Sequence, residues 1–421
     1  MKKILLLTGL VLCFLSPKAQ TNSLQYYFNE AKEAQKVGDN KKFYEMILEA
    51  HKLNPYHQAI LYQAGIAAAL NNKPEESITY LTKAVNIKAD YDLNNADLKT
   101  LAGRKGFEDL KTLQAELLKK IIGSDTAFMI KDRSLHMESI AAGESRNVFY
   151  LGSIHKRKIV RTDEKGNCSD FTTSGQDGLC SVFGIKVDAS KKILWACSSP
   201  MVEMENFDST TTSGVYKYDL KTGKLISKYT TTEKKNCVLG DLALDPKGKV
   251  FTSDSRNNTI FTVNEVSGKL ENYFSSEEFW SLQGLTFSED GRYLFIADYV
   301  RGIFRLDTQS KTLKLLSQNF DLSTKAIDGL AFYNNSLIAI QNGIYPMRVT
   351  QYFLDNAKEQ LTSYKIIDSG HPAFNEPTIG CLAKSSFYYV ANSQWAGYDA
   401  ARKIKPAAEL QEGVILKVDL K

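Results

Sequence analysis

The sequence has too little proline and glycine for a low-complexity or fibrous chain, with 9 Pro and 26 Gly among 421 residues. It also has no strong excess of charge of one sign, because 53 Lys and Arg face 48 Asp and Glu. The formal net charge of +5 becomes +2 when Lys2, Lys3 and Lys18 of the N-terminal leader are subtracted. This balance lacks the basic footprint of a nucleic-acid-binding protein, so no nucleic-acid partner is expected.

Long apolar runs are missing after the leader, and no transmembrane segment is expected, since a membrane helix needs about 18 apolar residues. At the N-terminus, Lys2 and Lys3 precede an apolar stretch over residues 4–15, which has the length of a signal-peptide core. The small residue Ala19 suits cleavage. We predict a signal peptide over residues 1–19 and a soluble exported protein, periplasmic or secreted. The alternative is a buried N-terminal helix.

Cysteine pairs with metal-ligand spacing, such as Cys-x-x-Cys, are also missing. Five cysteines follow the leader, and an odd number cannot all pair within one chain. One disulfide fits an oxidising compartment, and the alternative is that most of them are small buried residues in strands. The sequence also lacks a Gly-x-Ser-x-Gly elbow, a phosphate-binding Gly-rich lysine loop and a His-Glu-x-x-His motif, which sets those chemistries aside.

Residues 23–122 have helical periodicity, and two segments within them match at an offset of 34 residues. The matched pairs are Gly38 with Asn72, Ala50 with Ala84, Leu53 with Ile87 and Pro55 with Ala89. This period is expected of tetratricopeptide (TPR) helix pairs, in which small residues let the helices approach. We therefore predict a short TPR-like domain over residues 23–122. It either offers a concave surface to a protein partner or packs on the neighbouring domain.

From residue 126 onward, short β-rich runs recur in a constant order. An apolar strand near a glycine (GDLALD, QGLTFS, DGLAFY) precedes a strand that ends in a small polar residue (VFTSD, LFIAD). An alternating strand that usually ends in Asp or Asn (TIFTVN, GIFRLD) and a fourth strand follow. Four strands recurring at about 40–50 residues predict the blades of a β-propeller. The predicted fold class is α plus all-β: a short TPR-like array, then a six-bladed β-propeller over residues 126–421.

The two ends of the predicted propeller suggest how its ring closes. The chain stops at GVILKVDLK, directly after a third strand, so the last repeat lacks its outer strand. The segment TAFMIKD, residues 126–132, precedes the first repeat and has no other assignment. We predict that it adds antiparallel to the last blade as its outermost strand and thereby joins the ring.

The residues that begin the first strands, which we call the axial positions, are expected to meet on the channel axis at one end of the propeller. They are Glu138, Phe183, Gly240, Gln283, Asp328 and Ile379. Two carboxylates and one amide among them form an oxygen-rich cluster. Such oxygen donors suit Ca²⁺, Mg²⁺ or Mn²⁺.

The stretches MESIAAG, LQGLTFSEDGRYLFIADYVRGIFRLD and IDGLAF resemble the gluconolactonase/regucalcin-like family of six-bladed propellers, over about residues 134–421. The resemblance implies one divalent cation (Ca²⁺, Mn²⁺, Mg²⁺ or Zn²⁺) on the axis, held by a Glu, an Asn and an Asp, and lactone-ring opening in many members. Glu138 matches the Glu, and Asp328 matches the Asp that also acts as a base. Gln283 stands at the Asn position, and Gly240 replaces a further Asn. Both departures imply a different ligand geometry.

Further candidates lie on loops expected at the same end of the channel. His371 is an alternative base or a substrate contact, or else a solvated loop histidine, and Glu376 is a substrate contact close behind it. Trp395 and Tyr398, in a long insertion, either stack on a sugar ring or aromatic ligand, or pack the insertion onto the rim. Four residues that end second strands are interpreted as structural hydrogen-bonding groups: Asp254, Asp298, Asn342 and Asn392.

Two functions of different classes are consistent with these residues. The first is a divalent-cation-dependent hydrolase of the lactonase type, acting on a small sugar-derived or other cyclic ester, with Asp328 or His371 as base. The second is a non-catalytic module that binds a small ligand on the propeller and a protein through the helical repeat. NHL-type repeat propellers, which the phrase VFTSDSRNNTIFTV also resembles, are often binding modules. Propellers host both functions, so fold alone does not decide.

Overall fold

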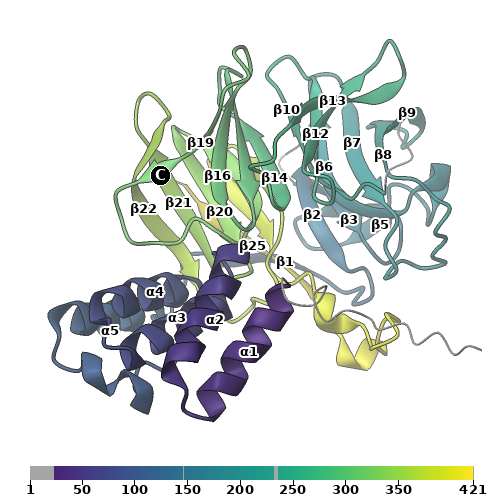
Figure 1. Cartoon of the computed structure of the whole chain (residues 1–421). Helices are drawn as coiled ribbons and strands as arrows, with labels where there is room; N and C mark the ends of the chain where they lie inside the picture. The colour runs from purple at the N-terminus through teal and green to yellow at the C-terminus, as the bar shows by residue number, and fades with distance from the viewer. Residues whose placement is uncertain (1–22, 146, 232–235, 421) are drawn as a thin grey trace, which may run out of the picture. The chain divides into compact units, whose positions relative to one another are not determined.

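The structure is a computed structural model that describes residues 23–145, 147–231 and 236–420 (Figure 1). The predicted signal peptide, residues 1–19, lies outside the described residues. The chain divides into two compact units. The smaller includes residues 23–85 and 91–113, and the larger consists of Asn86–Asp90 and the chain from Gln114 onward. Among the described helices, none is long and apolar enough to cross a membrane.

The smaller unit is helical. Its elements are α1 (Leu24–Lys36), α2 (Asn40–Leu53), α3 (Gln58–Leu70), α4 (Pro74–Ile87), the 3-10 helix η2 (Ala96–Leu101) and α5 (Lys105–Leu117). Side-chain caps begin α1 and α2, because Ser23 and Asp39 each accept a hydrogen bond from a backbone N–H three residues later. The side chain of Leu81 lies against Gly65 and would be 2.6 Å from a Cβ at that position. A small residue here therefore lets α3 and α4 approach closely.

The larger unit is made almost entirely of β-strands, in which successive strands pair antiparallel. One sheet contains β2 (Met137–Ala142), β3 (Val148–Ser153), β4 (Ile159–Asp163) and β5 (Cys168–Asp170). Another contains β14 (Leu282–Phe287), β15 (Tyr293–Asp298), β16 (Gly302–Asp307) and β17 (Leu313–Leu315). A five-stranded sheet contains β18 (Ser317–Gln318), β19 (Ile327–Tyr333), β20 (Ser336–Gln341), β21 (Arg348–Leu354) and β22 (Gln360–Ser369).

An eight-stranded sheet combines two such sets of four through a short parallel pairing of β13 with β9. The first set is β6 (Ser181–Asp188), β7 (Ile193–Ser199), β8 (Gly214–Asp219) and β9 (Leu225–Thr231). The second set is β10 (Leu239–Leu244), β11 (Val250–Asp254), β12 (Thr259–Asn264) and β13 (Lys269–Ser275). The last sheet has the order β23 (Gly380–Ala383), β24 (Ser386–Val390), β25 (Gly413–Asp419) and β1 (Asp125–Ile130).

The first strands of these sets form a closed ring. β2 contacts β6, β6 contacts β10, β10 contacts β14, β14 contacts β19, β19 contacts β23, and β23 contacts β2. A ring of first strands, with the later strands of each set outside it, is the arrangement of a propeller. The larger unit is therefore propeller-like (Figure 1).

Strand β1 joins the two ends of the larger unit. It pairs antiparallel with β25, with Met129 opposite Val414 and Ile130 opposite Gly413. Phe128 and Ile130 are buried in an apolar cluster with Phe149 of β3 and with residues of β2, β24 and β25. The N-terminal strand thus completes the sheet of the C-terminal strands and packs on the neighbouring one, which leaves no open seam between them.

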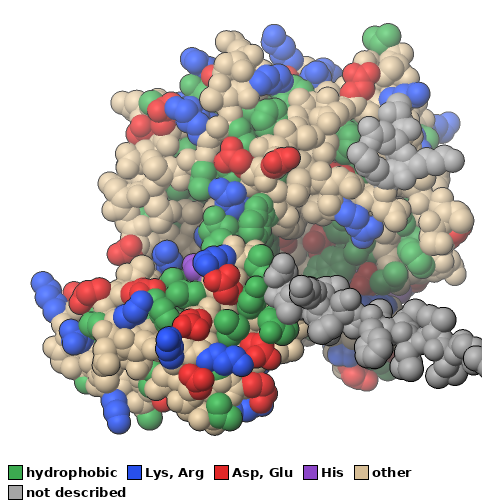
Figure 2. All heavy atoms as spheres, in the orientation of Figure 1, with side chains coloured by type: hydrophobic (Ala, Val, Ile, Leu, Met, Phe, Trp, Pro, Cys, Tyr) green, Lys and Arg blue, Asp and Glu red, His purple; other side chains and the backbone are tan. Residues whose placement is uncertain are grey.

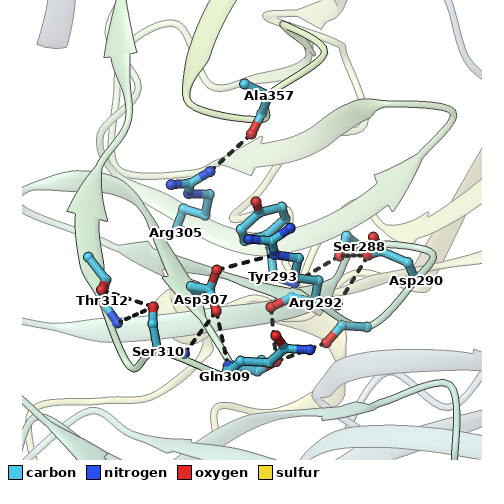
Figure 3. A network of polar contacts seen from close by, with 12 residues as sticks. Ser288, Asp290, Arg292, Tyr293, Arg305, Asp307, Gln309, Ser310, Thr312 and Ala357 are labelled. Carbon is cyan, nitrogen blue, oxygen red and sulfur yellow. Dashed lines mark hydrogen bonds and ion pairs between the residues drawn. The ribbon is translucent and has the colours of Figure 1, made fainter.

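Asp and Asn residues at the ends of third strands hold the turns that follow. In the sheet of β14–β17, the Oδ1 of Asp307 accepts hydrogen bonds from the backbone N–H groups of Gln309 (3.0 Å) and Ser310 (3.1 Å). Its Oδ2 accepts from the Nε of Arg292 at 3.3 Å (Figure 3). Asp163 and Asp219 cap their turns in the same way. The recurring Asp or Asn in the sequence is therefore a turn-forming residue.

None of the five cysteines among the described residues forms a disulfide. Cys180, Cys197 and Cys237 are buried like small apolar residues; Cys197 lies in β7, and the other two lie just before β6 and β10. On the face seen in Figure 2, Lys and Arg side chains are interspersed with Asp and Glu.

Candidate functional site

A small cavity lies inside the ring of first strands, and we call it the axial cavity. Its volume is about 220 Å³. The six axial positions line it: Glu138, Phe183, Gly240, Gln283, Asp328 and Ile379. Seven other residues complete its wall: Met201, Val238, Asp241, Ser255, Tyr299, Asn342 and Trp395. Every set of strands in the ring therefore contributes to one cavity, which is large enough for a small molecule and its water.

Irregularities in strand register place these side chains. In β2 the register shifts between Met137 and Ser139, in β10 between Leu239 and Leu242, and similar shifts occur at the starts of β6, β14 and β19. Such bulges re-aim side chains and are common beside active sites. The shift in β10 explains why two consecutive residues, Gly240 and Asp241, both line the cavity.

Glu138 is buried at the wall of the cavity, with 6% of its surface exposed. Its Oε2 accepts a hydrogen bond from the Ser393 hydroxyl and one from the Nε1 of Trp395 at 3.1 Å. Its Oε1 accepts none from the described residues. Burial, reinforced by the nearby carboxylate of Asp328, raises the pKa of Glu138 to about 8, although both hydrogen bonds oppose the shift. One oxygen is thus fixed and the other is available to a ligand.

Asp328 is oriented by a chain of two hydrogen bonds. The Tyr299 hydroxyl donates to the Oδ1 of Asn342 at 3.0 Å, and the Nδ2 of Asn342 donates to the Oδ2 of Asp328 at 2.8 Å. The first bond leaves the amide only one orientation, with its NH₂ toward the carboxylate. Burial, together with the negative charges of Asp241 and Glu376, raises the pKa of Asp328 to about 7.

A third carboxylate, Asp241, carries its own counter-ion. It is 2% exposed, and its Oδ1 lies 3.3 Å from the Nζ of Lys186. Its Oδ2 accepts a hydrogen bond from the backbone N–H of Leu285 at 3.3 Å. Gln283 lies on the adjacent first strand, where its Nε2 donates to the Ser281 hydroxyl at 3.4 Å and its Oε1 accepts no hydrogen bond from the described residues.

The charges around the cavity do not balance. Burial raises the pKa of Glu376 as well as those of Glu138 and Asp328, while Lys186, among the described carboxylates, pairs with Asp241 alone. Within the described chain, no group of three or more His, Cys, Asp or Glu side chains is placed to hold a metal ion. Glu138, Asp328 and Gln283 nevertheless line one cavity, and each has an oxygen that accepts no hydrogen bond from the described residues, which is the donor type that a hard divalent cation prefers.

Of the other predicted site residues, one lines this cavity and the rest lie outside its wall. Trp395 lines it, whereas Tyr398 is 8% exposed and its hydroxyl bonds the Nδ1 of His136 at 2.5 Å. Tyr398 therefore packs the insertion through its contact with His136. Glu376 does not line the cavity, but its charge contributes to the raised pKa values of Glu138 and Asp328.

His371 is not a solvated loop residue, because only 8% of its surface is exposed. Its Nδ1 accepts a hydrogen bond from the backbone N–H of Ala373 at 3.1 Å, and its ring packs on Phe374. It is absent from the residues that line the axial cavity. This loop turns back on itself, and the bond to Ala373 holds the imidazole within it.

Sequence reasoning missed several residues of the site. Asn342 ends a second strand, as Asp254 and Asp298 do, but those two accept backbone hydrogen bonds in turns, whereas Asn342 holds Asp328. Asp241 and Tyr299 were also missed. The only sequence signal for Asp241 was that it is a polar residue directly after the axial Gly240.

Comparisons with known proteins found no matching family model and no matching curated protein. Similar solved structures include a gluconolactonase from Xanthomonas campestris, with 12% identity and a TM-score of 0.49, covering 72% of this chain and 93% of that chain. Another is a virginiamycin B lyase from Staphylococcus aureus, with 12% identity and a TM-score of 0.47, covering 69% of this chain and 82% of that chain. The propeller-like description rests on strand pairing and the ring of first strands, independently of these similarities.

Proposed function

We propose that the protein is an exported hydrolase of the lactonase type, which opens a small sugar-derived or other cyclic ester in the axial cavity of a six-bladed propeller. The observation that carries the proposal is the shared cavity of Glu138 and Asp328, two residues 190 positions apart whose carboxylates each keep a free oxygen. Raised pKa values in a cavity with a few convergent polar groups are typical of reaction sites. The helical unit, as a TPR-like array, would bind a protein partner.

Asp328 would act as the general base. Its carboxylate accepts a proton from water, and the water oxygen forms a bond to the ester carbonyl carbon. The ring C–O bond then breaks, and the proton returns from Asp328 to the departing ring oxygen, which leaves a hydroxy acid. Asn342 and Tyr299 would keep the Oδ2 of Asp328 in place during both transfers, because their hydrogen bonds do not involve the reacting oxygen. His371 has no part in this scheme, since it does not line the cavity.

A divalent cation would be held by Glu138, Asp328 and Gln283. When bound, it would polarise the ester carbonyl and stabilise the oxyanion formed on attack. The lining residues include no His or Cys, which makes Ca²⁺, Mg²⁺ or Mn²⁺ better suited than Zn²⁺. Trp395 and Ser393 would hold Glu138 in position by bonding its other oxygen.

The alternative is a non-catalytic binding module, with the same cavity holding a small ligand. Gln283 and Gly240 at axial positions favour it, because they remove oxygen donors that the resembling family carries. The described residues also include no group of three or more His, Cys, Asp or Glu side chains placed to hold a metal ion, which favours the binding module. In that case Glu138 and Asp328 would bind ligand hydroxyl groups rather than take part in a reaction.

The test combines cation binding with turnover. Purified mature protein is titrated with Ca²⁺, Mn²⁺, Mg²⁺ and Zn²⁺ by calorimetry and assayed on a panel of sugar lactones. Asp328→Asn should lower turnover by about a thousandfold or more, while Asp321→Asn, at an exposed position, should leave it unchanged. Cation binding and turnover that are both absent in the wild type would reject the hydrolase and leave the binding module.

A further inference from the structure

A second pocket opens beside the axial cavity, and we call it the arginine pocket. Its volume is about 750 Å³. Its wall comes from the loop between β7 and β8, the residues around the end of β9, Arg256 after β11, and Arg402 in the insertion between β24 and β25. Four separate segments of the larger unit therefore converge on it, and two of them bring a guanidinium group.

The arginine pocket and the axial cavity are neighbours. Met201 lines both of them. Elsewhere consecutive residues divide between the two: Cys237 lines the pocket and Val238 the cavity, while Arg256 lines the pocket and Ser255 the cavity. At these places a single residue separates the axial cavity from the arginine pocket.

The described residues that line the arginine pocket carry a net positive charge. The guanidinium of Arg402, whose side chain is 62% exposed, is held by the Oε1 of Glu203 at 3.3 Å. Glu203 itself is 4% exposed, so this buried carboxylate fixes the arginine in place. The exposed Arg256 forms no ion pair with any described residue. Two guanidinium groups and one carboxylate leave a charge of +1, which an anionic group on a ligand would neutralise.

Hydroxyl groups and apolar atoms complete the lining. Residues 209–213 form an unbroken run of serines and threonines, and all five line the pocket. Val202 and Phe207, which are 49% and 43% exposed, provide apolar surface beside them. Thr210 and Thr211 donate their hydroxyl hydrogens to Asp208, and Ser213 donates to the carbonyl of Cys237, so these three can accept hydrogen bonds from a polyol. An exposed ring that packs on the C–H face of a sugar is the other element of a sugar site.

We propose that the arginine pocket is a subsite for an acidic sugar unit, which is a polyhydroxylated ring that bears a carboxylate or a phosphate. Arg256 and Arg402 bind the anionic group, and the run of hydroxyl side chains binds the ring. This unit is a substituent of the molecule whose ester occupies the axial cavity, so the inference rests on the proposed function and specifies its substrate class. The thin wall at Met201 is where the two parts of the substrate join.

The experiment measures binding with four probes that share one ring: D-glucuronate, D-glucose 6-phosphate, D-glucose and D-glucosamine. At low salt, at least one anionic probe should bind tenfold or more tightly than glucose, and glucosamine should bind most weakly. The advantage should shrink as salt rises. The tighter of the two anionic probes identifies the carboxylate or the phosphate as the natural group. Equal binding of all four probes, or preference for glucosamine, would overturn the proposal.

Variants locate the site. Arg256→Gln and Arg402→Gln should each weaken binding of the anionic probe about tenfold and leave glucose unchanged. Arg104→Gln, the same change at an exposed position of the helical unit, should have no effect. If all three variants behave alike, the anion does not bind in this pocket and the proposal fails.

Binding is also measured on Asp328→Asn, so that the two proposals can fail separately. Probe binding that persists in Asp328→Asn shows that the pocket binds independently of the reacting carboxylate. Selective probe binding by a wild-type protein that turns over no lactone supports the subsite and removes the hydrolase. Lactone turnover without selective probe binding supports the hydrolase and removes the subsite.

Discussion

Replacing Glu138 by glutamine should stabilise the protein at neutral pH when no cation is bound. Glu138 is 6% exposed, and its pKa is raised from 4.5 to about 8. Because the folded state holds a proton that the unfolded chain releases above pH 4.5, the stability of the wild type falls as pH rises from 4.5 through 8. A glutamine has no proton to release, and its amide oxygen can still accept from Ser393 and Trp395.

The size of the effect follows from the pKa difference. At pH 7 the wild type is 2.5 units above the unfolded pKa, which corresponds to about 3 kcal/mol at about 1.4 kcal/mol per unit. The free energy of unfolding of Glu138→Gln should therefore equal that of the wild type at pH 4 and exceed it by about 3 kcal/mol at pH 7. The advantage should be largest at pH 8 and above.

The measurement is urea denaturation in EDTA at pH 4 to 8, followed by tryptophan fluorescence. All three tryptophans, Trp195, Trp280 and Trp395, belong to the larger unit, so the signal reports that unit alone. Glu277→Gln, at an exposed position, is the matched control and should show no pH-dependent gain. A Glu138→Gln difference that stays flat between pH 4 and pH 8 would refute the conclusion that burial and like charge destabilise this carboxylate.

Adding a divalent cation should make the wild type more stable than Glu138→Gln. If Glu138 is a ligand, saturating Ca²⁺ at pH 7 stabilises the wild type by mass action and stabilises Glu138→Gln much less. A cation that raises the stability of both proteins equally would mean that Glu138 does not hold it.

Three further variants test the site and the fold. Tyr299→Phe should lower kcat for lactone hydrolysis about tenfold at unchanged KM, because Asn342 loses the bond that orients it. Gly166→Ala should cost at least about 2 kcal/mol more than Gly268→Ala in urea denaturation, since both have positive φ but only the Cβ at residue 166 would strike a β1 carbonyl. Asp368→Ala should cost about 3 kcal/mol, measured in the same way, because four hydrogen bonds to its buried carboxylate are lost. Equal costs for the two glycines, or no change in kcat or stability for the others, would contradict these assignments.

The axial positions show how far a repeat can predict a site. A propeller repeats one geometry around an axis, so residues that begin equivalent strands meet there whatever their separation in the chain. The repeat predicts Glu138, Gln283 and Asp328 on that ground, and all three line the axial cavity. The partner that orients Asp328 could not be predicted in the same way, because the residues equivalent to Asn342 in two other repeats, Asp254 and Asp298, accept backbone hydrogen bonds in turns instead.

The amino-acid sequence by itself determined the mostly β architecture with helices before it, because strand and helix periodicities and turn residues are local properties of the chain. It also marked the carboxylates at the axial positions. Tertiary structure alone decided that His371 is buried away from the cavity, that a register shift turns Asp241 inward beside Lys186, and that Arg402 and Arg256 line one pocket. These features depend on loops and bulges whose conformation is selected by packing between distant segments, and no local pattern encodes that selection.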